Sequence, residues 1–379
     1  MNKTIPLNHS LRRFARLAAL LAVSLPSLAS AQGYIRTNLV SDGVAPAPHV
    51  DPNLVNPWGM AFSSTSKIWI ANQRTGTSTI HAGSGEPDAL VVKVPGKPFG
   101  TPTGIVFSGG SGFRVGQLPA SAPSRFLFAG LDGTISGWSP GVNLTEAILA
   151  VDRSGSGASY TGLAISGGAN LPDRLFAANF GDGVLEVYNG DFQLINKVTD
   201  PALPPGVVPF GAETIGGLTF VTFVEPVRPG LPSPQGNGFV SVFDSDGNHV
   251  RRFASRGTLN LPWGLALAPA SFGKLGGMLL VGNLADGRIQ AFDPASGKFE
   301  GFVEGVNGKP VEIDGLWALK FGNGAHGASP NRLFFTSGPE FGNHGVFGTL
   351  EPVPELGSIA ALAAGFASVL GRRLRRKRA

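Results

Sequence analysis

The chain of 379 residues contains 55 glycines, 30 prolines and 26 phenylalanines, but no cysteine. It therefore has no disulfide bond, thiolate nucleophile or cysteine-ligated metal, and its many apolar residues argue against a disordered chain. Ten of the 30 basic residues lie in two terminal segments without Asp or Glu, so residues 32–355 carry 20 basic and 25 acidic residues, a formal charge of −5. A mildly acidic domain has no electrostatic attraction to phosphate backbones, which argues against nucleic acid as a partner.

The first 31 residues have the pattern of a secretory signal peptide. Basic residues between Lys3 and Arg16 precede an apolar run, Leu17 to Leu28, and the small residues Ala29-Ser30-Ala31 follow. This order predicts cleavage by signal peptidase after Ala31 and export through the inner membrane. An amphipathic first helix is the alternative, because the apolar run is shorter than the roughly 20 residues of a membrane span.

A repeated motif occupies the middle of the chain. Each copy has an aromatic or small residue, usually a glycine after it, and then alternating apolar positions; the copies begin at Pro57, Pro102, Tyr160, Pro209, Pro262 and Asp314. Further short apolar strands follow each copy, and Asp-Gly pairs at 132–133, 182–183 and 286–287 are typical hairpin turns. A repeat of about 50 residues built from short strands predicts a β-propeller with one blade per copy.

The number of blades depends on the two ends of this repeat. The sixth copy lacks a fourth strand, whereas residues 34–40 form a strand without a partner before the first copy. Pairing the two would close the ring and cover an exposed sheet edge. The sequence therefore predicts an all-β, six-bladed β-propeller over residues 32–350, with four-stranded blades and an N-terminal strand that closes the last blade. We expect its five tryptophans to pack between blades.

Residues 351–379 form a separate C-terminal segment. Pro352-Val353-Pro354-Glu355 precedes the almost uncharged stretch Leu356 to Gly371, and six basic residues follow. The stretch predicts an apolar helix that spans a membrane marginally, with the basic tail in the cytoplasm. This order resembles the PEP-CTERM sorting signal of Gram-negative bacteria, which implies processing near Pro354 and Glu355 by an exosortase-like protease, although Leu356 replaces the usual second proline. A plain C-terminal anchor is the alternative, and both place the protein at the cell surface or outside the cell.

The motifs also resemble a known group of propellers. Asn-Pro-Trp-Gly at 56–59, Ile-Trp-Ile-Ala-Asn at 68–72 and Pro-Trp-Gly-Leu-Ala-Leu at 262–267 are similar to a family of uncharacterised exported bacterial propellers, often with a PEP-CTERM signal. That family is related to NHL-repeat and SMP-30/gluconolactonase-like propellers. The resemblance covers about residues 33–350 and implies the fold and export, but no chemistry.

Asn and Asp residues at strand ends are the candidate ligand or metal residues: Asn72, Asp132, Asn179, Asn283 and Asp314. In a propeller the loops before first strands and after second strands open on one face. The five side chains would converge there around the central channel as oxygen ligands for Ca²⁺ or another divalent cation. The alternative, which we favour, is that they form local hydrogen bonds in turns.

The sequence lacks an identifiable catalytic set. Asp314-Gly315-Leu316 resembles a stretch of the gluconolactonase-like metal site, but no Glu precedes a first strand at the place that this site would need, and neither Glu213 nor Glu312 is a clean substitute. The six histidines have no zinc-site spacing, and the glycine-rich stretches 108–112 and 154–157 are interpreted as surface loops. We therefore expect a non-enzymatic binding or scaffold protein for an extracellular polymer, glycan or protein. The alternative is a divalent-metal-dependent lactonase or esterase with its site in the channel.

Overall fold

The computed structural model describes residues 33–168, 171–227 and 232–353. The predicted signal peptide with its cleavage site at Ala31, and the predicted processing site at Pro354 and Glu355 with the apolar helix after it, lie outside these residues. Within the described ranges, no helix has the length and apolar character needed to cross a membrane.

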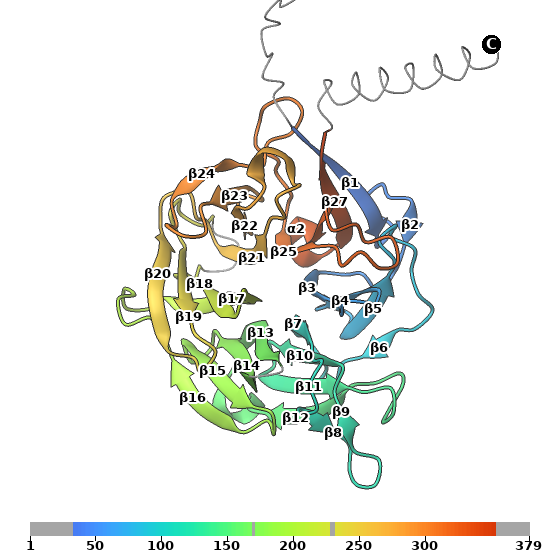
Figure 1. Ribbon diagram of the computed structural model, residues 1–379. Helices are drawn as coiled ribbons and strands as arrows, with labels where there is room; N and C mark the ends of the chain where they lie inside the picture. Colours follow the sequence, from blue (N-terminus) through green and yellow to red (C-terminus); the bar gives the residue numbers. More distant parts are fainter. Residues whose placement is uncertain (1–32, 169–170, 228–231, 354–379) are drawn as a thin grey trace, which may run out of the picture. The chain divides into compact units, whose positions relative to one another are not determined.

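The described residues form six blades around a central axis, each with four antiparallel strands (Figure 1). Blade one contains β3 (Pro57–Ala61), β4 (Ile68–Asn72), β5 (Thr77–His81) and β6 (Val92–Lys93), and blade two contains β7 (Pro102–Phe107), β10 (Phe126–Gly130), β11 (Thr134–Trp138) and β12 (Ile148–Asp152). Blade three contains β13 (Tyr160–Gly168), β14 (Leu171–Asn179), β15 (Val184–Asn189) and β16 (Leu194–Val198), and blade four contains β17 (Val208–Ile215), β18 (Leu218–Val224), β19 (Phe239–Phe243) and β20 (His249–Ser255). Blade five contains β21 (Pro262–Leu267), β22 (Leu279–Asn283), β23 (Ile289–Phe292) and β24 (Phe299–Phe302).

Blade six joins the two ends of the ring. It consists of β25 (Leu316–Phe321), β26 (Leu333–Ser337), β27 (Val346–Pro352) and β1 (Tyr34–Ser41), with β2 (His49–Val50) added in parallel outside β1. Strand β1 pairs antiparallel with β27 from Tyr34–Pro352 to Ser41–Val346, side by side in Figure 1. The predicted six-bladed propeller, closed by its N-terminal strand, is thus confirmed. Strand β27 extends to Pro352, so residues 351 and 352 belong to the sheet rather than to the C-terminal segment.

Few elements lie outside the blades. A small hairpin, β8 (Arg114–Val115) and β9 (Ala122–Pro123), is inserted between β7 and β10 of blade two. The helical turns in the described residues are η1 (Ser154–Ser156), η2 (Gly273–Leu275) and α2 (Pro339–Gly342). Apolar side chains from adjacent blades pack against each other, so the core is divided among the blade interfaces.

The repeated motif forms the first, innermost strand of every blade. All six first strands have a register shift near the glycine position, at the start of the strand. At this point neighbouring first strands approach so closely that a Cβ on Gly211 would lie 2.4 Å from the carbonyl oxygen of Trp263. In blade four, glycine is required because no side chain at position 211 fits against the next strand.

The sixth copy of the motif begins two residues later in the structure than the sequence comparison predicts. Leu316 pairs with Ser337 as Pro262 pairs with Asn283, so Trp317 corresponds to Trp263 and the glycine position is occupied by Ala318. Gly315 instead has a positive φ of 64° in the preceding turn. The sixth copy therefore begins at Leu316 and not at Asp314.

Candidate functional site

Four aromatic side chains fill the axis of the ring at the end where the first strands begin. Trp58 and Trp317 stack with ring centroids 3.6 Å apart, Trp263 meets them edge-on at 6.3 and 5.8 Å, and Phe210 lies 6.0 Å from Trp317. We call these four residues the aromatic plug. The face beside them, with the loops between second and third strands and between blades, is the plug face, and the opposite face is the open face.

The expectation that all five tryptophans pack between blades is only partly correct. Trp69 and Trp138 do pack between blades one and two, where the ring of Trp69 stacks on Phe126 with a centroid distance of 4.1 Å. Trp58, Trp263 and Trp317 instead meet at the axis, because the residue before the glycine position in the first strand projects there. The indole nitrogen of Trp263 donates to the carbonyl oxygen of Thr161 at 2.8 Å, which fixes its ring.

Little space remains inside the ring next to the plug. The cavity on the axis has a volume of about 20 Å³ and is lined by first-strand residues of all six blades, including Met60, Ile105 and Leu265. A volume of this size holds about one water molecule. This cavity beside the plug therefore has no room for an organic substrate.

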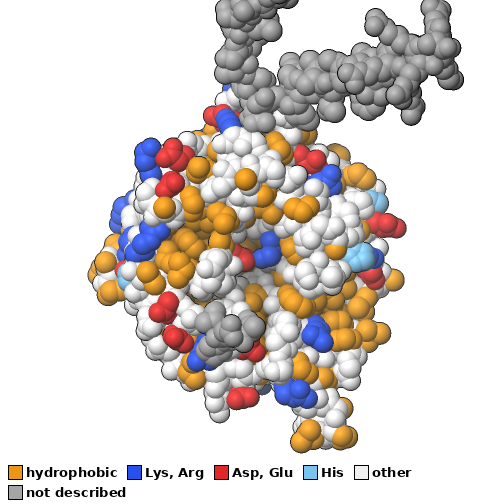
Figure 2. Space-filling view, in the orientation of Figure 1, with side chains coloured by type: hydrophobic (Ala, Val, Ile, Leu, Met, Phe, Trp, Pro, Cys, Tyr) orange, Lys and Arg blue, Asp and Glu red, His pale blue; other side chains and the backbone are white. Residues whose placement is uncertain are grey.

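The open face has a hollow at the axis, where Figure 2 shows a basic and an acidic side chain. In the structure the Nζ of Lys320, on β25, lies 2.9 and 3.0 Å from the two carboxylate oxygens of Glu213, on β17. The pair joins blades four and six across the mouth of the channel. Both side chains are partly exposed, and Lys320 also lies 6.0 Å from the ring centroid of Phe62.

Three of the predicted ligand residues, Asn72, Asn179 and Asn283, are fully buried within their blades. The amide oxygen of Asn179 accepts from the backbone N–H of Ser159 at 3.1 Å, and that of Asn283 accepts from the N–H of Asn260 at 3.0 Å. Each oxygen thus holds the loop that enters the first strand of the same blade. Both amide oxygens therefore already accept a hydrogen bond within their blade, as the alternative of local hydrogen bonds in turns predicts.

The same asparagines take part in a repeated polar arrangement. The amide nitrogen of Asn72 donates to Thr79 at 3.0 Å, and that of Asn179 donates to Glu186 at 3.2 Å. In blade five, Asn283 and Gln290 both donate to the carbonyl oxygen of Thr258. The partner on the third strand follows the asparagine by seven residues in blades one, three and five. This spacing is a sequence signal for a buried pair, and our sequence reasoning did not use it.

The two predicted aspartates also have local partners. Asp132 accepts from the backbone N–H of Lys97 at 2.7 Å and from the hydroxyl of Thr134 at 3.0 and 3.1 Å. The exposed Asp314 accepts from the N–H of Glu340 at 3.0 Å. None of these contacts joins one predicted ligand residue to another. In the described part of the chain, no three His, Asp or Glu side chains are grouped so that they could hold a metal ion.

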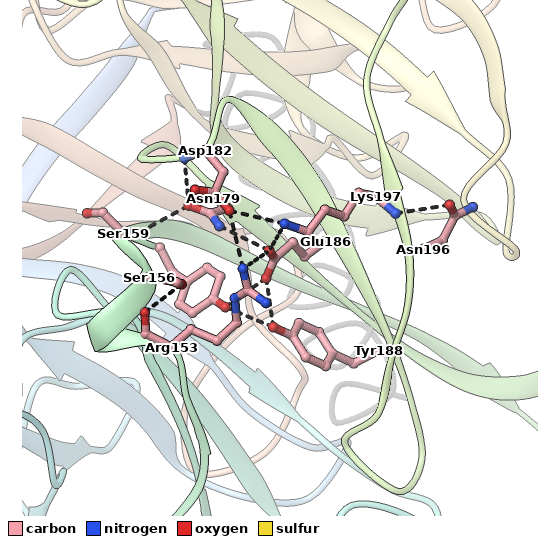
Figure 3. A network of polar contacts seen from close by, with 10 residues as sticks. Arg153, Ser156, Ser159, Asn179, Asp182, Glu186, Tyr188, Asn196 and Lys197 are labelled. Carbon is pink, nitrogen blue, oxygen red and sulfur yellow. Dashed lines mark hydrogen bonds and ion pairs between the residues drawn. The ribbon is translucent and has the colours of Figure 1, made fainter.

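A dense polar network surrounds Glu186 between blades two and three (Figure 3). The Glu186 carboxylate is fully buried and accepts from the hydroxyls of Tyr160 and Tyr188 at 2.8 and 2.7 Å. Arg153 and Lys197 each lie 3.3 Å from its other oxygen, and both also reach Asp182. Two cations thus balance two carboxylates, which is how a protein interior accommodates buried charge.

The two phenols of this network stay protonated over the ordinary pH range. Burial raises the pKa of both Tyr160 and Tyr188 above the usual value, and the neighbouring Glu186 carboxylate raises it further. Their hydroxyls therefore remain hydrogen-bond donors to Glu186. Glu186 and both phenols are buried and bonded to one another, and the partly exposed Arg153 and Lys197 pair with Glu186, so the network connects two blades.

Exposed aromatic side chains are found on the loops of the plug face. Phe341, in α2, is 92% exposed, and Phe99, on the loop from blade one to blade two, is 64% exposed. Arg74 holds the α2 turn: its Nε donates to the carbonyl oxygen of Gly342 at 2.7 Å. Half-buried Leu131, Phe180 and Leu284 pack around the plug from the same face.

Comparisons with known proteins support the fold and identify relatives. No family model matches the chain. The uncharacterized protein R648 of Acanthamoeba polyphaga mimivirus is 31% identical over 326 residues, covering 82% of this chain and 78% of the relative. Protein L690 of the same virus is 29% identical over 327 residues, covering 82% of this chain and 84% of L690.

Among solved structures, a streptogramin B lyase superimposes with a TM-score of 0.50 over 85% of this chain and 98% of that one. The two sequences are 12% identical, so this likeness shows a shared propeller fold and carries no information about activity. The identity and coverage of the R648 match show that the chain belongs to the β-propeller family of this mimivirus protein.

Proposed function

We propose that this protein is an exported, non-enzymatic binding protein that engages an extracellular polymer, glycan or protein through its plug face. The observation that carries the proposal is the exposure of aromatic side chains around an axis that the plug fills. Aromatic residues are enriched on surfaces where proteins bind partners.

The conformation of the α2 turn supports this assignment. Glu340 and Phe341 have φ values of 54° and 58°, in the left-handed region that costs a bulky residue about 1–3 kcal/mol. Contacts from Arg74 and Asp314 hold this backbone in place. The strain is maintained although the Phe341 side chain packs against almost nothing, which is expected if the side chain serves a partner.

The filled axis disfavours the alternative of a metal-dependent hydrolase. Such an enzyme needs an open coordination position and room for its substrate beside the metal. Here the axial cavity has a volume of only about 20 Å³, and Asn179, Asn283 and Asp314 accept hydrogen bonds from loops of their own blades.

Export and surface location rest on the two terminal patterns. We propose that signal peptidase cleaves after Ala31 and that a PEP-CTERM-type signal is processed near Glu355 by an exosortase-like protease. Mass measurement of the protein recovered from the outside of the producing cells tests both points. A mature mass of residues 32 to about 355 is expected, whereas an intact chain would contradict the proposal.

Co-sedimentation with cell-envelope material tests binding by the plug face. We expect the Phe99→Ser/Phe341→Ser double variant to be retained at least about tenfold less than the unmodified protein, as for loss of interface anchors. Leu118→Ser is the matched control, because Leu118 is 87% exposed on the inserted hairpin of the open face. Equal retention of all three proteins would show that the plug face is not the binding surface.

A further inference from the structure

The open face contains a pocket that the proposed plug-face function does not use. It lies between blades two and three beside the axis, where the first strands β7 and β13 end, and its volume is about 490 Å³. It is lined by Phe107, Ser108, Ile165, Ser166, Asp173 and three glycines. This volume is within the range of small-ligand pockets, about 300–1,000 Å³.

One side of the pocket is apolar and fixed in position. Phe107 and Ile165 are half-buried and occupy equivalent positions near the ends of their first strands. The ring of Phe107 packs edge-on against Phe126 with a centroid distance of 5.5 Å. Since this contact restrains the ring, Phe107 offers a ligand a flat apolar surface.

The other side of the pocket is built around the carboxylate of Asp173. A Cβ on Gly110 would lie 2.5 Å from one oxygen of Asp173, and a Cβ on Gly167 would lie 2.6 Å from the other. Any side chain at these two positions would displace the carboxylate. The glycine-rich stretch 108–112, interpreted from sequence as a surface loop, thus makes room for an acidic group in the pocket.

The hydrogen-bonding capacity of the pocket is only partly used by the described residues. Ser108 is buried, and its hydroxyl has no hydrogen-bond partner among them. Arg174 follows Asp173 in the chain but lies toward Asp246 instead, at 3.9 Å. An unpaired buried hydroxyl costs stability, and because the Ser108 hydroxyl is enclosed, a ligand would pair with it once the side chain rotates toward the pocket.

From these features we propose that the pocket binds a neutral saccharide unit of an extracellular glycan. Among the described residues that line the pocket there is no Lys or Arg, which disfavours an anionic ligand. Sugar hydroxyls would donate to Asp173 and exchange hydrogen bonds with Ser108, and the apolar face of the sugar ring would cover Phe107. Hydrogen bonds to a charged acceptor are the stronger kind, so Asp173 sets most of the affinity.

Saturation-transfer NMR on the full chain tests the proposal. The probes are neutral tetrasaccharides of glucose, galactose, mannose and N-acetylglucosamine, with glucosamine tetrasaccharide as a cationic comparison. We expect at least one neutral probe to bind, and Asp173→Asn to weaken its binding about tenfold, as for loss of a charge-assisted hydrogen bond. Gly110→Ala, whose methyl group would displace the carboxylate, should weaken it similarly. Asp191→Asn, in an exposed turn of the same blade, is the matched control and should bind as the unmodified protein does.

Three results would overturn the proposal. The first is no transfer to any neutral probe, and the second is binding of the glucosamine probe alone, which would make the pocket an amine site. The third is equal affinity of Asp173→Asn and the unmodified protein. Thermal unfolding of each variant verifies that it is folded, and Ser108→Ala provides a second pocket variant if Asp173→Asn is unstable.

Discussion

The two faces of the ring differ most clearly along one strand. Strand β25 places Trp317 in the aromatic plug, and three residues later it places Lys320 in the hollow of the open face. Trp317 is almost fully buried in apolar contacts, whereas Lys320 has a single partly exposed ion partner. The plug-face end of the axis therefore stabilises the ring, and the open-face end leaves polar groups available to ligands.

The largest effect is expected from Trp317→Ala. The substitution removes the stack on Trp58 and the hydrogen bond from the Trp317 indole nitrogen to Asn56, 3.1 Å long. We expect the free energy of unfolding to fall by about 3–5 kcal/mol in chemical denaturation. Trp317→Phe, which keeps an aromatic ring, should lose less. A loss below about 1 kcal/mol for Trp317→Ala would show that the plug does not hold the ring together.

Glu186→Gln extends the comparison to the buried network at the plug-face end of blade three. The variant leaves Arg153 and Lys197 with one carboxylate instead of two. Breaking a buried ion pair in this way should lower the free energy of unfolding by about 3 kcal/mol. Glu300→Gln, which removes an exposed pair with Lys298, is the control and should change it by less than about 0.5 kcal/mol. Equal effects of the two variants would contradict a structural role for the network.

A pH-dependent contribution is expected from Asp200, just after β16. Burial alone would raise its pKa, but hydrogen bonds from Arg252 and Ser241 lower the pKa to about 2. Because the pKa in the folded state is below that of the unfolded chain, the stabilisation is present above about pH 4 and is lost as the pH falls toward 2. It amounts to about 2 kcal/mol.

Chemical denaturation at about pH 5 and about pH 2.5 measures this contribution. The unmodified protein should lose about 2 kcal/mol more stability between the two conditions than Asp200→Asn does. Identical losses would show that Asp200 does not titrate with a lowered pKa.

The smallest effect is expected from Lys320→Met on the open face. The pair with Glu213 is partly exposed, and such pairs contribute less than about 1 kcal/mol. We therefore expect a change of this size or less in the same denaturation assay. A loss above about 2 kcal/mol would remove the contrast between the two ends of β25.

The fold could be predicted because repetition and strand pattern are local properties of the sequence. The six motif copies predicted the number of blades. The unpaired strand near Tyr34 predicted how the ring closes, which the pairing of β1 with β27 confirms. The plug was missed because three tryptophans, from blades five, six and one, meet at the axis only after the ring has formed. These three share the position before the glycine position of the first-strand motif, which Trp69 and Trp138 do not, but the motif alone does not say that this position projects to the axis.

The candidate sites depended on contacts that the sequence does not contain. Asn72, Asn179 and Asn283 were correctly placed at strand ends, but the direction of the Asn179 and Asn283 side chains is set by the incoming loop of the blade, and that of Asn72 by Thr77 and Thr79. The open-face pocket combines the ends of two first strands with Asp173 of a second strand. Phe341 was not considered, because its exposure follows from a backbone conformation rather than from its residue type.

The metal content of the purified protein tests most directly whether this ring is a binding protein rather than a metal hydrolase. The protein would be purified in buffer containing Ca²⁺, dialysed, and measured by elemental analysis together with Asp314→Ala. A ring whose axis is filled by the plug predicts a substoichiometric content of divalent metal that is the same in both proteins. One divalent ion per chain, lost in Asp314→Ala, would contradict it and restore the hydrolase alternative.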